Sequence, residues 1–191
     1  MKIGVLALQG AFAEHRQMLE KLGTTVVEIR EKAHFTDDLD GVVLPGGEST
    51  VQGKLLRETG LFAPLQQAIN NGLPVFGTCA GLILLAKRLS NDENVYLNAL
   101  NVTVKRNAYG RQLGSFTTDL TLQDIDSFPA VFIRAPYVES AGDNVETLAE
   151  VDGHVVAVRQ DNILATAFHP ELTADTRVHE YFVNMCKLKK N

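Results

Sequence analysis

The sequence predicts an α/β fold with a mostly parallel sheet, on three observations. In the first half of the chain, short apolar runs alternate with segments of helical spacing. Such alternation implies right-handed crossovers and a parallel sheet covered by helices on both faces. The second half changes to closely spaced strand-like pieces with few helices between them. We therefore expect a three-layer, flavodoxin-like mixed sheet, mostly parallel, with an antiparallel extension in the second half.

The chain opens with a predicted strand, turn and helix. Residues 2–8 form a short apolar run that is cut off by Gln9 and Gly10. Residues 11–22 then show helical spacing and stop at a glycine, the residue that most commonly ends a helix. A run rich in β-branched residues at 24–29 predicts the second strand.

Turn-forming residues mark the elements that follow. Residues 41–44 are apolar and stop at a Pro-Gly-Gly turn, which predicts a third strand. Ser49 is expected to cap a helix that continues through 55–56. Residues 61–70 predict another helix, and 74–76 a short fourth strand.

After a predicted helix at 82–89, the pattern becomes strand-like. Strands are expected at 101–104, 114–122, 130–133, 145–151, 154–159 and 163–168. Asp152-Gly153 and Asp161-Asn162 have the composition of hairpin turns. An amphipathic helix is expected over 176–187, and no repeat or linker interrupts the sequence. One domain, 1–191, is therefore expected.

Composition narrows the classes of protein. The 191 residues are 45% hydrophobic and 21% charged, as in ordinary globular proteins, with no apolar stretch of membrane-spanning length. The first apolar run is too short for a signal-peptide core, so we expect a cytoplasmic protein with no membrane contact. The net charge of -5 gives no reason to expect nucleic acid as a partner. The two cysteines, Cys79 and Cys186, are expected to be free thiols.

Cys79 is the first candidate for chemistry. It lies in the string Gly77-Thr78-Cys79-Ala80-Gly81, between a predicted strand and a predicted helix, as a nucleophile elbow requires. Small flanking residues permit the sharp turn, and the start of a helix favours thiolate over thiol. A lone cysteine is more often a small buried residue, and the flanking glycines favour the nucleophile here.

His169 and Glu171 form the second candidate feature. Pro170 biases His169 toward extended backbone, in which side chains two residues apart lie on the same side. A thiol needs a base, and that base works best when a carboxylate orients it. Taken alone, His169 would be read as an ordinary histidine. Because the C-terminal ends of parallel strands meet at one sheet edge, Cys79 and His169 are expected to be neighbours.

The turn Gly46-Gly47 leaves another strand at that edge. Its bare amides could bind a phosphate or contribute to an oxyanion hole together with the amide of Ala80. Since no lysine follows in phosphate-loop spacing, the oxyanion hole is preferred, although an ordinary tight turn would look the same. The reaction so predicted uses no metal and no organic cofactor.

Together these motifs resemble the class I, triad-type glutamine amidotransferases, and one branch in particular, the glutaminase subunits of pyridoxal 5'-phosphate synthase. The resemblance extends nearly from end to end of the chain. The strings that carry it are Leu8-Gln9-Gly10-Ala11, Pro45-Gly46-Gly47-Glu48-Ser49-Thr50, Gly77-Thr78-Cys79-Ala80-Gly81, Arg106-Asn107, Gly110-Arg111-Gln112, Phe132-Ile133-Arg134-Ala135-Pro136 and Phe168-His169-Pro170-Glu171-Leu172-Thr173. Two departures are Ala7, where glycine is frequent, and Tyr137, where histidine is common.

The resemblance implies a substrate, a set of binding residues and a partner. L-glutamine would bind at Gly47, Glu48, Ser49, Arg106, Ile133 and Arg134. Ordinary surface salt bridges remain the alternative for the two arginines. The implied partner is a barrel-shaped synthase subunit that uses the ammonia to build pyridoxal 5'-phosphate. Gln9 and Gly10 are candidates for coupling the glutaminase to that partner.

Three other functions are compatible with parts of this pattern. A glutaminase of another class I pathway would share the triad and differ in its acceptor. A γ-glutamyl hydrolase on a similar fold would need a roomier pocket and would act on γ-glutamyl peptides. A non-enzymatic regulatory domain would lose nothing when Cys79 is replaced.

Overall fold

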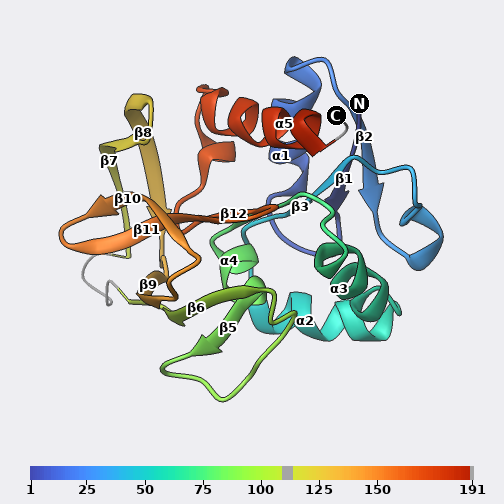
Figure 1. Ribbon diagram of the computed structural model, residues 1–191, viewed down its shortest axis with the longest axis horizontal. Coiled ribbons are helices and arrows are strands. Elements are labelled where there is room, and N and C mark those ends of the chain that lie inside the picture. The colour runs from blue at the N-terminus through green and yellow to red at the C-terminus, as the bar shows by residue number, and fades with distance from the viewer. Residues whose placement is uncertain (109–113, 190–191) are drawn as a thin grey trace.

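The computed structural model describes residues 1–108 and 114–189 and is built on a mixed sheet between layers of helices (Figure 1). Five parallel strands form its first part. In spatial order they are β2 (Thr25–Ile29), β1 (Lys2–Leu6), β3 (Gly41–Leu44), β4 (Val75–Thr78) and β12 (Ile163–Thr166). This order is that of a flavodoxin-like sheet and confirms the predicted fold class.

The register of these strands decides which turns become neighbours. Leu44 at the end of β3 pairs with Gly77, and Thr166 at the end of β12 pairs with Thr78. All three strands therefore end at the same level. The turns that follow them, which carry the candidate catalytic residues, share one edge of the sheet.

An antiparallel extension continues the sheet beyond β12, as predicted. Along it lie β11 (His154–Gln160), β9 (Tyr137–Ala141), β6 (Leu100–Lys105) and β5 (Ala86–Leu89), while β10 (Glu146–Val151) pairs with β11 on the side. Only the outermost pair, β5 with β6, is parallel again. The sheet is thus mixed.

Hairpins make up much of this second half. The predicted turns Asp152-Gly153 and Asp161-Asn162 join β10 to β11 and β11 to β12, and Asp152 and Asp161 have φ of 51° and 50°. The strands β7 (Ser115–Leu122) and β8 (Ile125–Ile133) form a separate two-stranded ribbon. Its β8 end reaches the sheet edge that carries the candidate site.

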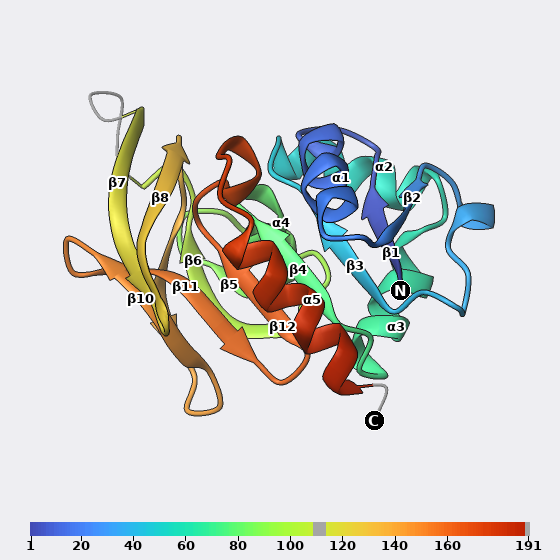
Figure 2. The ribbon, with the colours of Figure 1, turned by 90° about the horizontal axis from the view of Figure 1, so that it is seen from above.

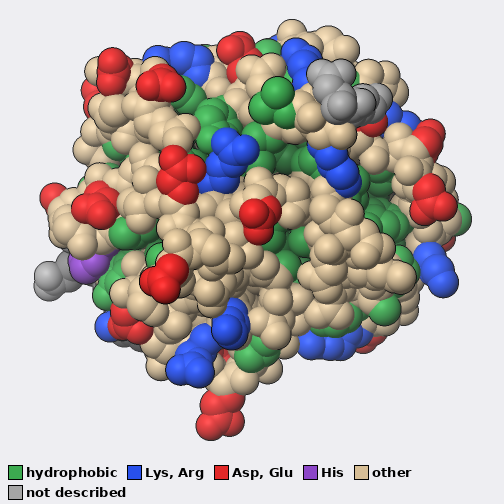
Figure 3. Space-filling model, viewed as in Figure 1, with side chains coloured by type: hydrophobic (Ala, Val, Ile, Leu, Met, Phe, Trp, Pro, Cys, Tyr) green, Lys and Arg blue, Asp and Glu red, His purple; other side chains and the backbone are tan. Residues whose placement is uncertain are grey.

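Helices cover both faces of the sheet. The helices α1 (Phe12–Lys21) and α5 (Arg177–Lys189) lie side by side on one face (Figure 2). The opposite face carries α2 (Ser49–Glu58), α3 (Phe62–Asn70) and α4 (Ala80–Leu85). No helix of the described residues is long and apolar enough to cross a membrane. On the face in Figure 3, acidic and basic side chains are interspersed.

The structure differs from the sequence predictions in several details. Ser49 is the first residue of α2 rather than its cap, because Glu48 accepts the 3.1 Å hydrogen bond from the Thr50 amide. The helix predicted at 82–89 ends at Leu85, and Ala86–Leu89 is strand β5, which pairs with β6. Strand β9 was missed; its backbone is held by pairing with β6, while much of its sequence is exposed and polar.

Candidate active site

Cys79 occupies a sharp turn between β4 and α4. Its backbone has φ 48° and ψ −97°, a conformation that is costly for any residue with a side chain. The turn is held in place by a 2.8 Å hydrogen bond from the Cys79 amide to the Thr166 carbonyl on β12. A strained residue between a strand and a helix is the arrangement of a nucleophile elbow.

The two glycines that flank the elbow are required by close backbone contacts. A Cβ on Gly77 would lie 2.7 Å from the carbonyl carbon of Gly81. A Cβ on Gly81 would overlap the carbonyl oxygen of Leu44 at the end of β3. The spacing of glycines read from the sequence therefore reflects the packing of the elbow against β3.

His169 and Glu171 meet beside Cys79, immediately after β12. The Nδ1 of His169 lies 2.8 Å from the Glu171 Oε1, and the amide of His169 donates a 2.8 Å hydrogen bond to the Val131 carbonyl on β8. The two side chains converge as expected, but the backbone does so differently. Residues Pro170–Leu172 form a 3-10 turn, η2, instead of extended chain. Both side chains are almost fully buried.

Electrostatics favour a charged form of this pair. Burial opposes charge on His169, but its hydrogen bonds with Cys79 and Glu171 prevail and raise the pKa of His169 to about 10. Burial likewise opposes charge on Glu171, yet the adjacent His15 ring and the hydrogen bond with His169 hold the pKa of Glu171 well below its usual range. At neutral pH, His169 is therefore protonated beside an ionised Glu171.

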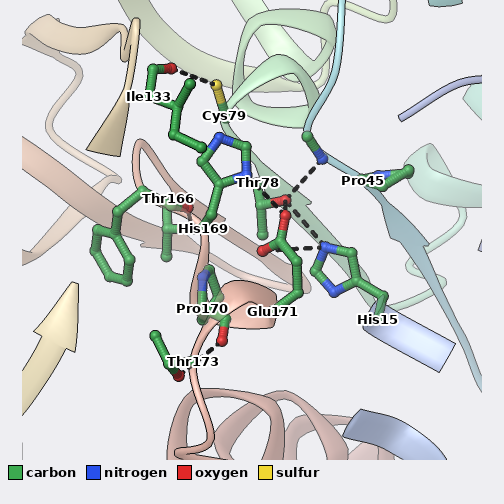
Figure 4. Close-up of polar contacts among 12 residues, drawn as sticks. His15, Pro45, Thr78, Cys79, Ile133, Thr166, His169, Pro170, Glu171 and Thr173 are labelled. Carbon is green, nitrogen blue, oxygen red and sulfur yellow. Dashed lines mark hydrogen bonds and ion pairs between the residues drawn. The ribbon is translucent and has the colours of Figure 1, made fainter. Parts of the chain in front are cut away.

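A cavity of about 460 Å³ opens in front of these groups. Cys79 lines it, and the Cys79 sulfur lies 4.0 Å from the carbonyl oxygen of Ile133. Figure 4 marks this contact with a dashed line. The lining residues are Gln9, Gly47, Glu48, Ser49, Cys79, Ile83, Arg106, Asn107, Ser115, Ile133, Arg134 and His169. A cavity of this size suits a small polar substrate.

The Gly46-Gly47 turn lies against the same groups. A Cβ on Gly46 would overlap the imidazole ring of His169, and one on Gly47 would overlap the side-chain oxygen of Gln9. The Gly46 amide donates a 2.9 Å hydrogen bond to the Thr78 hydroxyl, and its carbonyl accepts one of 2.9 Å from Ala11. Both polar groups of Gly46 are thus already paired.

Gln9 and Gly10 lie next to this turn, where the strand order reverses between β1 and β3. The Gln9 side-chain oxygen accepts a 2.8 Å hydrogen bond from the Glu48 amide. Gly10 has φ 101° and approaches the Gly46 carbonyl so closely that a Cβ would overlap it. In open α/β sheets, ligands bind at such a reversal point. The two predicted coupling residues are therefore in contact with the candidate oxyanion turn.

The predicted glutamine-binding residues surround the cavity from three elements. The Arg106 guanidinium pairs with Asp92, and its other nitrogen lies 3.3 Å from the Glu48 carboxylate. Ser49 is 2% exposed, and its hydroxyl has no hydrogen-bond partner among the described residues. Ile133 is 39% exposed at the rim, and Arg134 follows it with φ 44°. The string at 110–112 lies outside the described residues.

Sequence reasoning missed several residues that contact this site. Asp92 holds Arg106, and Asn91 hydrogen-bonds both the amide and the carbonyl of Arg106, at 3.0 and 2.9 Å. His15 lies 3.4 Å from Glu171, and Thr78 contacts His15 at 3.1 Å. Thr78 belongs to the elbow string, which is the one signal that pointed to any of them. The others are distant in the chain and carry no local pattern.

Comparisons with known proteins show which family the chain resembles. The model of the SNO glutamine amidotransferase family matches residues 5–188. Pyridoxal 5'-phosphate synthase subunit PdxT of Bifidobacterium longum is 60% identical over 188 residues, covering 95% of this chain and 99% of that protein. PdxT of Streptococcus pneumoniae strain CGSP14 is 52% identical over 193 residues and the full length of both.

Solved structures show the same fold. A crystal structure of a glutamine amidotransferase superposes with a TM-score of 0.92 at 45% identity, covering 97% of this chain and 98% of that one. A putative GMP synthase subunit from Thermoplasma acidophilum has a TM-score of 0.72 at 19% identity, covering 100% and 96%, which is a likeness of fold alone. Since the family model covers nearly the whole chain and full-length relatives share half or more of its residues, this protein belongs to the SNO glutamine amidotransferase family.

Proposed function

We propose that this chain hydrolyses L-glutamine to L-glutamate and ammonia through a γ-glutamyl thioester on Cys79. The observation that carries the proposal is the convergence of the strained Cys79 and the buried His169–Glu171 pair on one cavity. A cysteine on an elbow, a histidine in contact with it and a carboxylate on the far ring nitrogen are the parts that cysteine-based acyl transfer requires.

Glutamine binds with its backbone groups away from Cys79. Its α-carboxylate needs a cation or amide donors, and Arg106, Arg134 and the amides of the Gly47–Ser49 segment supply them. Its α-ammonium needs an acceptor, for which the Glu48 carboxylate and the Ile133 carbonyl are placed at the cavity. The unpaired hydroxyl of Ser49 gains a partner when the substrate is present.

The first half-reaction forms the thioester. The Cys79 thiolate attacks the side-chain amide carbon, and the carbon–nitrogen bond breaks as protonated His169 passes its proton to the leaving nitrogen. Ammonia leaves and His169 is neutral. The raised pKa of His169 ensures that the proton is available at neutral pH.

The oxyanion formed in this step requires donors fixed near the elbow. We assign this role to the amide of Ala80, which follows the nucleophile, together with the Gly46-Gly47 turn. Because the Gly46 amide is already bonded to Thr78, the donor from this turn is the amide of Gly47. Gly46 contributes by permitting close contact with His169.

The second half-reaction releases glutamate. Neutral His169 takes a proton from water, the resulting hydroxide attacks the thioester carbonyl, and the carbon–sulfur bond breaks to restore the thiolate. His169 is left protonated, and the product acid loses its proton to solvent. Glu171 keeps Nδ1 of His169 protonated in both halves, which leaves Nε2 free to exchange the moving proton.

We further propose that the ammonia passes to a barrel-shaped synthase subunit for pyridoxal 5'-phosphate, in the cytoplasm. Two PdxT proteins are 60% and 52% identical to this chain over nearly its full length, which supports the assignment of this partner. Free ammonia would be mostly ammonium in neutral water and could not attack a carbonyl, so a protected route is needed. We assign the sensing of docking to Gln9, and its contact with Glu48 beside the oxyanion turn supports this role.

The test is glutamate release from glutamine by the wild type, Cys79→Ala and Cys186→Ala, each with and without the synthase subunit. Wild type and Cys186→Ala should be stimulated by the subunit, and Cys79→Ala should be silent in both conditions. Gln9→Ala should lose most of the stimulation. A Cys79→Ala variant that releases glutamate normally would refute the mechanism, and an active wild type that is indifferent to the subunit would refute the partner.

A further inference from the structure

Two histidines outside the proposed triad are buried beneath it. His15 on α1 and His179 on α5 are both fully buried, and His15 Nδ1 lies 2.9 Å from His179 Nε2. Their rings meet the edge of Phe76 on β4, with centroids 5.9 and 5.6 Å away. Burying two imidazoles costs free energy that an apolar pair would not cost. The pair therefore needs an explanation beyond core packing.

The pair reaches the catalytic carboxylate. His15 Nε2 lies 3.4 Å from Glu171 Oε2 and 3.1 Å from the Thr78 hydroxyl, which is itself 3.5 Å from Glu171 Oε1. His169 approaches the same Oε1 at 2.8 Å. Figure 4 shows the side chains of Cys79, His169, Glu171 and His15 lying one after another in space. Glu171 thus lies between two histidines: Oε1 is hydrogen-bonded to His169, whereas Oε2 has no hydrogen-bond partner among the described residues and is approached by His15 at 3.4 Å.

The hydrogen-bond partners of the two rings decide which ring nitrogen, that of His15 or that of His179, donates. Burial lowers the pKa of His179 to about 3, so this ring is neutral, and its Nδ1 has no hydrogen-bond partner among the described residues. An unpaired acceptor costs less than an unpaired N–H, which places the hydrogen of His179 on Nε2. That hydrogen is donated to His15 Nδ1. His15 then carries its own hydrogen on Nε2, facing Glu171 and Thr78.

We propose that His15, oriented by His179, is a positioning residue that holds the Glu171 carboxylate so that its other oxygen stays on His169. This inference rests on the proposed function, because it assigns Glu171 to catalysis. The contact of His15 with Glu171 is electrostatic at 3.4 Å, and the aligned hydrogen bond of His15 goes to Thr78. Since Thr78 also accepts from Gly46, the same chain links the carboxylate to the oxyanion turn.

Two substitutions of His15 that differ by one methylene separate positioning from packing. The amide nitrogen of Gln reaches the place of Nε2 and keeps a donor toward Glu171, whereas that of Asn reaches only the place of Nδ1. In complex with the synthase subunit, His15→Asn should lower kcat on the order of 10- to 100-fold, with KM for glutamine within about twofold. His15→Gln should restore most of the rate. Unfolding by urea checks that both variants are folded.

A measurement on the unmodified protein covers the case in which a variant does not fold. In ¹⁵N-labelled wild type, NMR should show His179 neutral from pH 5 to 9 in the Nε2–H form. Titration of His179 near its ordinary pKa of about 6.5, or an Nδ1–H form, would overturn the inference. So would a folded His15→Asn that turns over like the wild type, or a His15→Gln no better than His15→Asn. A wild type that releases no glutamate would instead refute the proposed function. The NMR measurement does not depend on that activity, so the two failures can be told apart.

Discussion

The side-chain hydroxyl of Thr78 accepts a 2.9 Å hydrogen bond from the amide of Gly46, and both residues are buried. Thr78→Val keeps the shape of the side chain and leaves that amide unpaired. We expect the free energy of unfolding to fall by roughly 1–3 kcal/mol, the cost of an unsatisfied buried donor, and kcat to fall with it. Urea denaturation and glutamate release measure both. Thr78→Ser keeps the hydroxyl and should resemble the wild type; a Val variant of unchanged stability would contradict the assignment.

Arg106 should act on substrate binding more than on chemistry. Its guanidinium contacts Asp92 and Glu48 at once, which a lysine ammonium cannot reproduce with the same geometry. Arg106→Lys should raise KM for glutamine roughly tenfold, because one charge-assisted hydrogen bond is lost. The value of kcat should change little. The matched control is Arg16→Lys, which alters the surface pair with Glu28. An equal loss of kcat would place Arg106 in the transition state instead.

His169 should titrate far above an ordinary histidine. Its pKa is raised to about 10, so it is protonated below that pH and becomes neutral as the pH rises through it. The thioester-forming step, which consumes this proton, should hold level from pH 7 to 9 and fall near pH 10. NMR titration of labelled histidine and the burst of ammonia measure the two effects. Glu171→Gln removes one cause of the shift and should move the midpoint downward; an unmoved midpoint would argue against the pairing.

The two cysteines should differ in reactivity. Burial raises the pKa of Cys186 to about 12, so its thiol stays protonated at neutral pH on the inner face of α5. Cys79 faces the cavity. Iodoacetamide should therefore modify Cys79 first in the folded protein, and saturating glutamine should slow that reaction. Peptide mass spectrometry locates the label, and equal labelling of both cysteines without denaturant would disprove this expectation.

The elements predicted best are those whose sequence pattern and local surroundings agree. Strand β3 is a continuous apolar run and β4 is buried at every position, because a parallel strand covered on both faces has no side exposed to solvent. The segment 86–89 shows the opposite case. Its pattern continues a helix, yet pairing with β6 turns it into β5, with Ala86 and Leu89 buried and the two residues between them exposed.

The residues of the site also fall into two groups, those that local sequence predicts and those that only the tertiary structure shows. Cys79, His169 and Glu171 were found because of their neighbours in the chain: two glycines permit the close backbone contacts of the elbow, and a proline restricts the backbone of His169. Asp92 carries no such signal, and its contact with Arg106 exists only after β5 and β6 are paired. Glu171 reaches His169 through a 3-10 turn and not through extended chain. The spacing of two residues between them could not predict this turn.

The sequence by itself determined the fold class, most elements and the three candidate catalytic residues, since periodicity and turn chemistry act over a few neighbouring positions. The tertiary structure decided what lies behind those residues. His15 and His179 come from helices at opposite ends of the chain, and packing of α1 beside α5 brings them within 2.9 Å. Contacts between distant segments depend on strand order and register, which are properties of the whole sheet and leave no mark on either helix alone.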